Sequence, residues 1–193
     1  LPEIADKLGD AIKKVKRISQ TLEDFIAKSL PEKLEDIGNI WKTKYPVSDM
    51  LEGRTIFEDI MGEYRYKKSE GWVHTADIAN NFKGVDFYKG TEIGNQIFAK
   101  KAVSMKTTIL TDVNAWLNSK PIQDNIRFLK DGLENVEGMT SNGHIMKITE
   151  KAEVHIYMPK ENATADLQKE WHNKLDAIHP KIKFEIHILE DYI

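Results

Sequence analysis

Apolar residues recur at helical spacing through the first part of the chain. Between residues 8 and 26 they follow one another at steps of three and four, which places them on one face of a helix. A second helix is expected after Pro31, because proline suits the first turn of a helix. A third helix is predicted over about residues 53–66. We therefore expect an N-terminal helical segment over residues 1–48 and a second domain over 49–193.

From residue 72 onwards the apolar residues follow the alternation of β-strands. Strands are expected over residues 72–75, 85–88, 96–106, 153–158 and 182–188. Glycine and asparagine in residues 89–95 predict a hairpin turn between the second and third of these strands. Residues 138–143 are predicted to form a loop.

Helices separate the strands in the second half of the chain. Residues 112–136 predict two helices that meet at Pro121, because proline disfavours the helical conformation of the residue before it and suits the first turn of a new helix. Thr164 is expected to cap a further helix, which Pro180 ends. The strand–helix–strand order at the end favours a right-handed parallel crossover. These elements predict an α/β domain with a mixed sheet behind an N-terminal helical segment.

The composition limits the classes of function. Hydrophobic residues make up 40% of the chain and charged residues 31%, and no apolar run approaches the ~20 residues that cross a bilayer. Cysteine is absent, which excludes disulfides and thiolate metal sites. A net charge of −3 argues against a protein that coats DNA through its overall charge. The chain begins Leu-Pro-Glu without methionine, and we expect it to be a piece of a longer protein.

Three residues around the predicted hairpin form the set that metal-dependent phosphodiester cleavage needs. Asp86 lies in the strand before the hairpin and Lys106 in the strand after it, where a shared face would make them neighbours. Glu58 lies in the preceding helix, with Asp59 and Glu63 as rivals for its role. In such a set the acids hold a divalent cation and the lysine steadies the attacking water or the charged phosphorane. A solvent-facing acid and an ordinary cross-strand ion pair are the alternative interpretation.

Residues 84–87, Gly-Val-Asp-Phe, and 103–108, Val-Ser-Met-Lys-Thr-Thr, resemble the PD-(D/E)xK, or restriction-endonuclease-like, nuclease superfamily. Its signature is a strand aspartate, a hairpin and an acid-x-lysine strand, preceded by a helix that bears a glutamate. Residues 54–60 fit that helix. The resemblance covers residues 53–193 and implies a restriction-endonuclease-like mixed sheet flanked by helices.

The resemblance also implies roles for individual residues. Glu58 and Asp86 would bind Mg²⁺, with Mn²⁺ or Zn²⁺ as alternatives, because oxygen ligands suit hard cations. Lys106 would orient the attacking water. Ser104 and Thr107 would hold the lysine or contact the phosphate.

The sequence departs from the family pattern at Ser104, where the family usually carries a second acid. This substitution removes one metal ligand. Gln96 or Glu92 from the hairpin is expected to compensate for it.

A helical segment ahead of a divergent nuclease is similar to the C-terminal toxin domains of bacterial polymorphic toxins, including contact-dependent growth inhibition effectors. That resemblance implies a toxin, secreted or displayed at the cell surface within a larger protein. It would cleave tRNA or DNA in the cytoplasm of a competing bacterium, where a cognate immunity protein neutralises it. The net negative charge of the chain slightly favours tRNA over DNA as the substrate. Two alternatives stay open, namely a DNA-repair or restriction-type endonuclease acting in its own cell and a non-enzymatic helical interaction module.

Other polar residues give weaker signals. His155 and His187 are expected on adjacent strands, opposite the apolar stripe, as surface histidines. The basic groups at residues 65–68 and 100–101 flank the proposed site and would either attract phosphate or form a solvated surface. Trp72, at the start of the sheet, is the one tryptophan that does not follow an apolar stripe.

Overall fold

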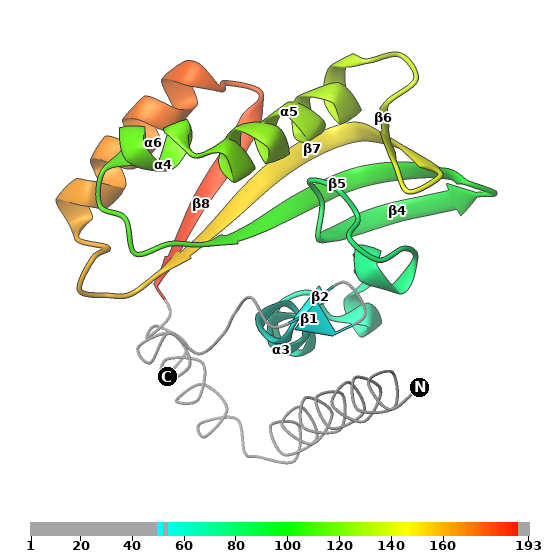
Figure 1. Ribbon diagram of the computed structural model, residues 1–193, viewed down its shortest axis with the longest axis horizontal. Coiled ribbons are helices and arrows are strands. Elements are labelled where there is room, and N and C mark those ends of the chain that lie inside the picture. Colours follow the sequence, from blue (N-terminus) through cyan, green and yellow to red (C-terminus); the bar gives the residue numbers. More distant parts are fainter. Residues whose placement is uncertain (1–49, 52–53, 189–193) are drawn as a thin grey trace, which may run out of the picture.

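The computed structural model of the chain describes residues 50–51 and 54–188. The helices predicted over residues 1–48 lie outside this part. The described residues form a mixed α/β fold in which one curled sheet is flanked by helices (Figure 1). The predicted α/β class with a mixed sheet is confirmed at this level. Within the described ranges, no helix is long and apolar enough to cross a membrane.

The main sheet is mixed and has six strands. They are β3 (Val73–His74), β4 (Phe87–Ile93), β5 (Gln96–Thr107), β6 (Met139–Ser141), β7 (His144–Met158) and β8 (Ile182–Ile188). Their order is β3-β4-β5-β7-β6, and β8 pairs with the second half of β7. β5 and β7 are parallel, as are β7 and β8, whereas the other pairs are antiparallel. The parallel connection predicted for the last two strands is therefore confirmed.

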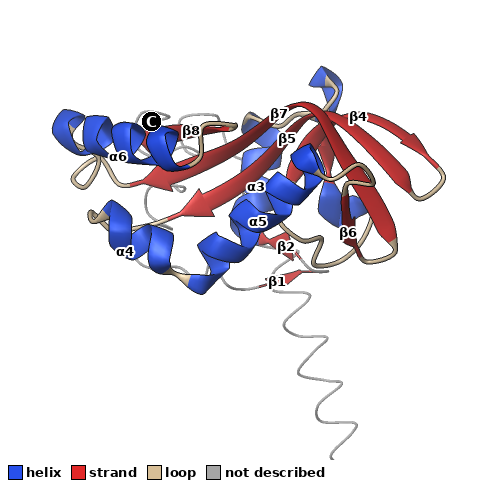
Figure 2. Ribbon diagram, turned by 90° about the horizontal axis from the view of Figure 1, so that it is seen from above, coloured by secondary structure: helices blue, strands red, loops and turns tan. Residues whose placement is uncertain are grey.

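Helices cover both faces of this sheet. They are α3 (Ile56–Tyr64), α4 (Val113–Asn118), α5 (Lys120–Glu134) and α6 (Ala165–Ile178), with 3₁₀ turns η1 (Lys68–Glu70) and η2 (Thr75–Asp77). Figures 1 and 2 show α4, α5 and α6 on one face, which we name the three-helix face, and α3 on the opposite face, which we name the α3 face. Two short strands, β1 (Met50–Leu51) and β2 (Arg54–Thr55), form a separate antiparallel pair ahead of α3.

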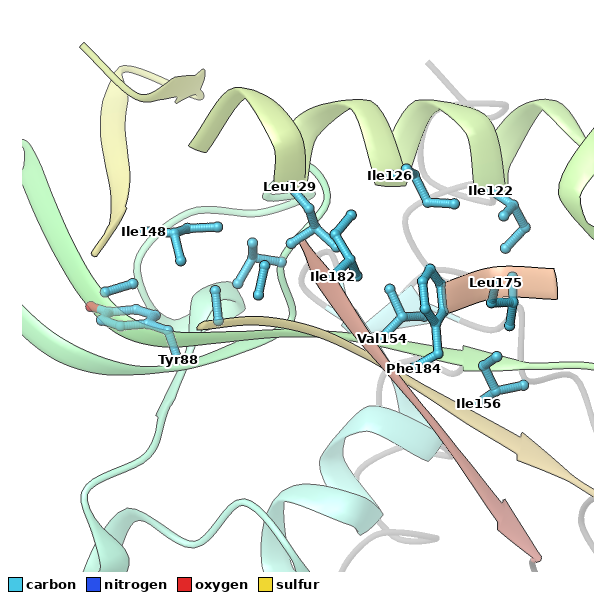
Figure 3. Close-up of a cluster of buried hydrophobic side chains, with 14 of the residues drawn as sticks. Tyr88, Ile122, Ile126, Leu129, Ile148, Val154, Ile156, Leu175, Ile182 and Phe184 are labelled. Carbon is cyan, nitrogen blue, oxygen red and sulfur yellow. The ribbon is translucent and has the colours of Figure 1, made fainter. Parts of the chain in front are cut away.

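The main hydrophobic core lies under the three-helix face. Alternate residues of β7 and β8 point into it, together with one stripe of α5 and one of α6 (Figure 3). Its members include Val154, Ile156, Ile182, Phe184, Ile122, Ile126, Leu129, Trp171 and Leu175. Burying a side chain of this size stabilises the fold by about 1.5–3 kcal/mol. This layer fixes β5 and β7 and thereby the residues that they carry.

Two helix starts follow from side-chain caps in the sequence. The Asp112 carboxylate accepts hydrogen bonds from the N–H groups of Asn114 and Ala115, which begins α4. Thr164 accepts one from the Leu167 N–H and begins α6, as predicted. The expected division of residues 112–136 into two helices is also confirmed.

Three boundaries differ from the prediction. Residues 138–143 form β6 and a two-residue turn rather than a loop, since Asn142 and Gly143 adopt φ values of 49° and 79° that suit a tight hairpin. β7 consequently begins at His144. β4 continues to Ile93, which shortens the first hairpin turn to two residues. α3 begins at Ile56, because the preceding residues pair with β1.

Candidate active site

Glu58, Asp86 and Lys106 line one open cleft beside the ends of β4 and β5, with a volume of about 610 Å³. Glu58 comes from α3, Asp86 from the residues just before β4, and Lys106 from β5. The first turns of α5 complete the wall. The two predicted metal ligands and the predicted catalytic lysine are therefore brought together from three separate elements.

The backbone holds Asp86 against β5. Its N–H donates to the carbonyl of Val103 at 2.9 Å, and its Oδ2 accepts from the N–H of Met105 at 2.6 Å. Gly84 allows the turn before it, with a φ of +73°, and a Cβ there would lie 2.5 Å from Cβ of Phe128. The carboxylate is thus fixed beside the strand that carries the lysine.

The environment of Asp86 opposes its charge. Burial, followed by repulsion from Glu58, raises the pKa of its carboxyl from 3.8 to about 6. Lys106, the Met105 N–H and His74 act in the opposite direction but do not cancel the rise. Two carboxylates that repel each other in a partly desolvated cleft are an arrangement that a bound cation relieves.

His74 fixes the second acid. Its Nε2 lies 3.2 Å from Oε2 of Glu58, and its ring stacks on Phe87 at 4.5 Å. The His74 side chain is only 8% exposed, so the imidazole is held from both sides. The rival acid Glu63 is exposed and lines a different pocket, with Lys67. The sequence pattern did not identify His74 as a site residue. The only signal nearby was Trp72, which does not follow an apolar stripe.

The other two predicted site residues lie outside the cleft that contains Asp86. Ser104 shares a strand face with Lys106 but is fully buried, and its Oγ has no hydrogen-bond partner among the residues that the structure describes. Thr107 lies on the opposite strand face and lines an adjoining pocket of about 380 Å³, together with Glu58 and Lys106. Direct contact between Ser104 and a phosphate is therefore excluded in this conformation.

Neither hairpin residue can replace the missing acid. Gln96 opens β5, whereas Lys106 lies near its end, so the two are roughly 33 Å apart at the rise of an extended strand. Glu92 pairs with Ile97 at the same distant end, and its carboxylate accepts a hydrogen bond from the hydroxyl of Tyr88. The expected compensation by Gln96 or Glu92 is wrong.

The basic side chains at the cleft are also different from those expected. Lys83 and Lys120 line it, and Lys120 forms an ion pair with Asp124 at 2.7 Å. Arg65 contacts His187 and Lys101 contacts Glu153, both on the α3 face. Neither Arg65 nor Lys101 lines the cleft. Lys101 and Lys106 lie five residues apart on β5, so strand alternation places them on opposite faces.

The fold and this cleft define an α/β domain with two carboxylates and a lysine at one end of a mixed sheet. No protein-family model, curated protein or solved structure matches the chain. The residues of the cleft are therefore the basis for assigning a function.

Proposed function

We propose that the chain is a metal-dependent nuclease with a restriction-endonuclease-like fold, hydrolysing phosphodiester bonds in the cleft that contains Asp86. The observation that carries the proposal is the convergence of Glu58, Asp86 and Lys106 from three elements. The order of these elements supports the proposal too, since a helix with the glutamate precedes the aspartate, a hairpin and the lysine strand.

The residues of the cleft fit a hard divalent cation. Both Glu58 and Asp86 offer carboxylate oxygens, which suit Mg²⁺, with Mn²⁺ or Zn²⁺ as substitutes. Burial and then repulsion from Glu58 raise the pKa of Asp86, and a bound cation would offset both effects by stabilising the charged carboxylate. When bound, the ion would polarise the phosphate and lower the pKa of a water molecule.

The chain's own residues would hold and balance the reacting groups. The N–H of Met105 and the imidazole of His74 fix the two carboxylates. Lys106 would orient the attacking water and offset the negative charge that develops on the phosphorane. Lys83 and Lys120 line the same cleft and would attract the phosphates on either side of the scissile bond.

The proposed biological role is that of a toxin domain delivered as part of a larger secreted or surface protein. Its substrate in the target cytoplasm would be tRNA, with DNA as the alternative, and a cognate immunity protein would neutralise it. The acidic total supports tRNA, because a compact folded RNA is recognised by shape and by local phosphate contacts. Growth arrest on expression of the chain alone, prevented by mutation of Asp86, would separate a toxin from a nuclease that acts harmlessly in its own cell.

The deciding experiment is a cleavage assay on total tRNA and on plasmid DNA, with Mg²⁺, Mn²⁺, Zn²⁺ or EDTA. The wild-type chain is compared with Asp86→Asn and with Asp124→Asn, which removes a partly exposed acid from the same cleft. We expect metal-dependent cutting that is lost in Asp86→Asn and retained in Asp124→Asn. No cutting of either substrate by folded wild-type protein would overturn the proposal.

A further inference from the structure

A second group of ionisable side chains lies on the α3 face, opposite the main core. His155 on β7 pairs in register with Glu185 on β8, and His187 lies two residues further along β8. Because alternate residues of a strand share a face, all three side chains point to the same side. One ligand atom from each lies within 4.8 Å of the others.

His155 has an unusual environment for a buried imidazole. The residue is 2% exposed, and its Nδ1 lies 2.6 Å from the hydroxyl of Tyr66. Its Nε2 lies 3.2 Å from Oε2 of Glu185, but it forms no hydrogen bond with any described residue. Its nearest acidic neighbours are Glu185 and, at 3.8 Å, Oε2 of Glu153. Buried polar atoms in folded proteins nearly always have a hydrogen-bond partner, so this nitrogen is a candidate to bind a ligand.

We propose that His155, Glu185 and His187 bind a first-row transition metal ion such as Zn²⁺. Two imidazoles and one carboxylate are a common protein ligand set for zinc, with the fourth position open to water. At metal–ligand distances of about 2.0–2.1 Å, neighbouring ligands of a tetrahedral site lie about 3.3 Å apart. Oε2 of Glu185 lies 3.2 Å from Nε2 of His155 and 3.0 Å from Nε2 of His187, close to that spacing.

The surrounding residues orient these ligands. If Nδ1–H of His155 donates to the Tyr66 hydroxyl, its Nε2 carries the lone pair that a metal requires, an arrangement typical of metal-binding histidines. Lys183 binds Oε1 of Glu185 at 2.8 Å, which leaves Oε2 as the oxygen nearest both imidazoles. The side chains of Glu185 and His187 are 25% and 16% exposed, so an ion can reach them from solvent.

Neighbouring cations limit the affinity. The Nη1 of Arg65 lies 2.8 Å from Nδ1 of His187, so metal binding at Nε2 moves the ring proton to Nδ1 and requires Arg65 to turn away. The guanidinium already lies 5.8 Å from the ring centres of Tyr66 and Tyr157, where aromatic faces can stabilise it. We therefore expect a site weaker than a closed structural zinc site.

The test is a Zn²⁺ titration of the full chain against a chromophoric chelator, after removal of metals with EDTA and in excess Mg²⁺, which would occupy the proposed nuclease cleft. Wild-type protein should bind one equivalent, and the Co²⁺ form should show a tetrahedral visible spectrum. Glu185→Gln and His187→Ala should each weaken binding by about tenfold or more. Glu185→Gln preserves the size of the side chain, so it keeps the test valid if the smaller replacement fails to fold.

Two control variants separate this site from other ligands. Asp86→Asn removes a carboxylate of the proposed nuclease cleft and should bind Zn²⁺ as the wild type does, whether or not the chain cleaves nucleic acid. His172→Ala removes a histidine of α6, outside the cluster, and should also have no effect. Absence of Zn²⁺ binding, wild-type affinity in folded Glu185→Gln, or loss of binding in Asp86→Asn instead would each overturn the assignment.

Discussion

Replacing Asp86 with asparagine should stabilise the fold while it abolishes cleavage. Burial and the nearby Glu58 raise the pKa of the Asp86 carboxyl from 3.8 to about 6, which corresponds to a cost of about 3 kcal/mol for the charged form in the folded protein. Asparagine keeps the size of the side chain, and its amide oxygen can still accept the hydrogen bond from Met105. We expect a gain of roughly 1–3 kcal/mol in the free energy of unfolding near neutral pH.

The gain should depend on pH in a defined direction. Between about pH 4 and about pH 6 the folded protein keeps the Asp86 proton and the unfolded chain loses it, so wild-type stability falls as the pH rises through this window. Above this pH window the charged Asp86 carboxylate destabilises the folded protein in full, and below the window the carboxyl is protonated and the destabilisation disappears. The advantage of Asp86→Asn should therefore be near zero at about pH 3.5 and largest above about pH 6.

Urea unfolding in EDTA, at several pH values across this window, measures the effect. The control is Asp124→Asn, since the hydrogen bond from Lys120 lowers the pKa of the Asp124 carboxyl. Because its pKa is lower in the folded protein, the Asp124 carboxylate stabilises the fold at pH values above its pKa in the unfolded chain. Asp124→Asn should therefore be less stable than the wild type at neutral pH and equally stable in acid. The two aspartates of one cleft should thus respond with opposite signs.

Two results would refute the reasoning. One is an Asp86→Asn protein that is less stable than wild type at about pH 8; the other is a difference that does not change with pH. Added Mg²⁺ gives an independent check, because a ligand that binds only the folded state stabilises it. Mg²⁺ should raise the unfolding midpoint of the wild type and leave that of Asp86→Asn unchanged.

Three further substitutions test other parts of the structure. Lys106→Ala should reduce cleavage by about 100-fold or more and change the free energy of unfolding by less than about 1 kcal/mol, as cleavage rates and urea titrations will show; near-normal activity would exclude the lysine from catalysis. Gly90→Ala should destabilise the β4–β5 hairpin by about 1–3 kcal/mol, because the new Cβ would lie 2.0 Å from the carbonyl oxygen of Phe98; an unchanged melting temperature would contradict this close approach. Thr164→Ala should cost about 1 kcal/mol through loss of the cap on the Leu167 N–H, whereas Thr164→Ser should retain the unfolding midpoint.

Periodicity was sufficient wherever one face of an element is buried. Val154 and Ile156 alternate along β7, and Phe184 continues the pattern on β8. The buried face of these strands and the pairing of β7 with β8 could therefore be predicted. The same rule placed Asp86 and Lys106 side by side, because the hairpin between them fixes the strand pairing. The sequence therefore named all three cleft residues that carry the proposed chemistry, with Asp59 and Glu63 as rivals to Glu58, as well as their element order.

Contacts between distant elements could not be predicted in this way. His155 was expected on the surface, because alternation places it opposite the apolar stripe. It is buried instead, against Tyr66 in the segment that follows α3. Nothing in the pattern of a strand shows whether a helix covers its second face. The contact between Glu58 and His74 could not be predicted for the same reason, because it depends on how α3 packs against β3.

The burial of Ser104 is consistent with a proposed metal site that uses two acids rather than three. The residue is fully buried beside Asp86 and Lys106, so an ionised carboxylate at this position would have to be desolvated. It would also add a third negative charge where the pKa of Asp86 is already raised to about 6 by burial and by Glu58. A serine avoids both costs. We therefore expect the proposed nuclease to bind its metal through Glu58 and Asp86. Water molecules would take the coordination positions that a third acid would otherwise occupy.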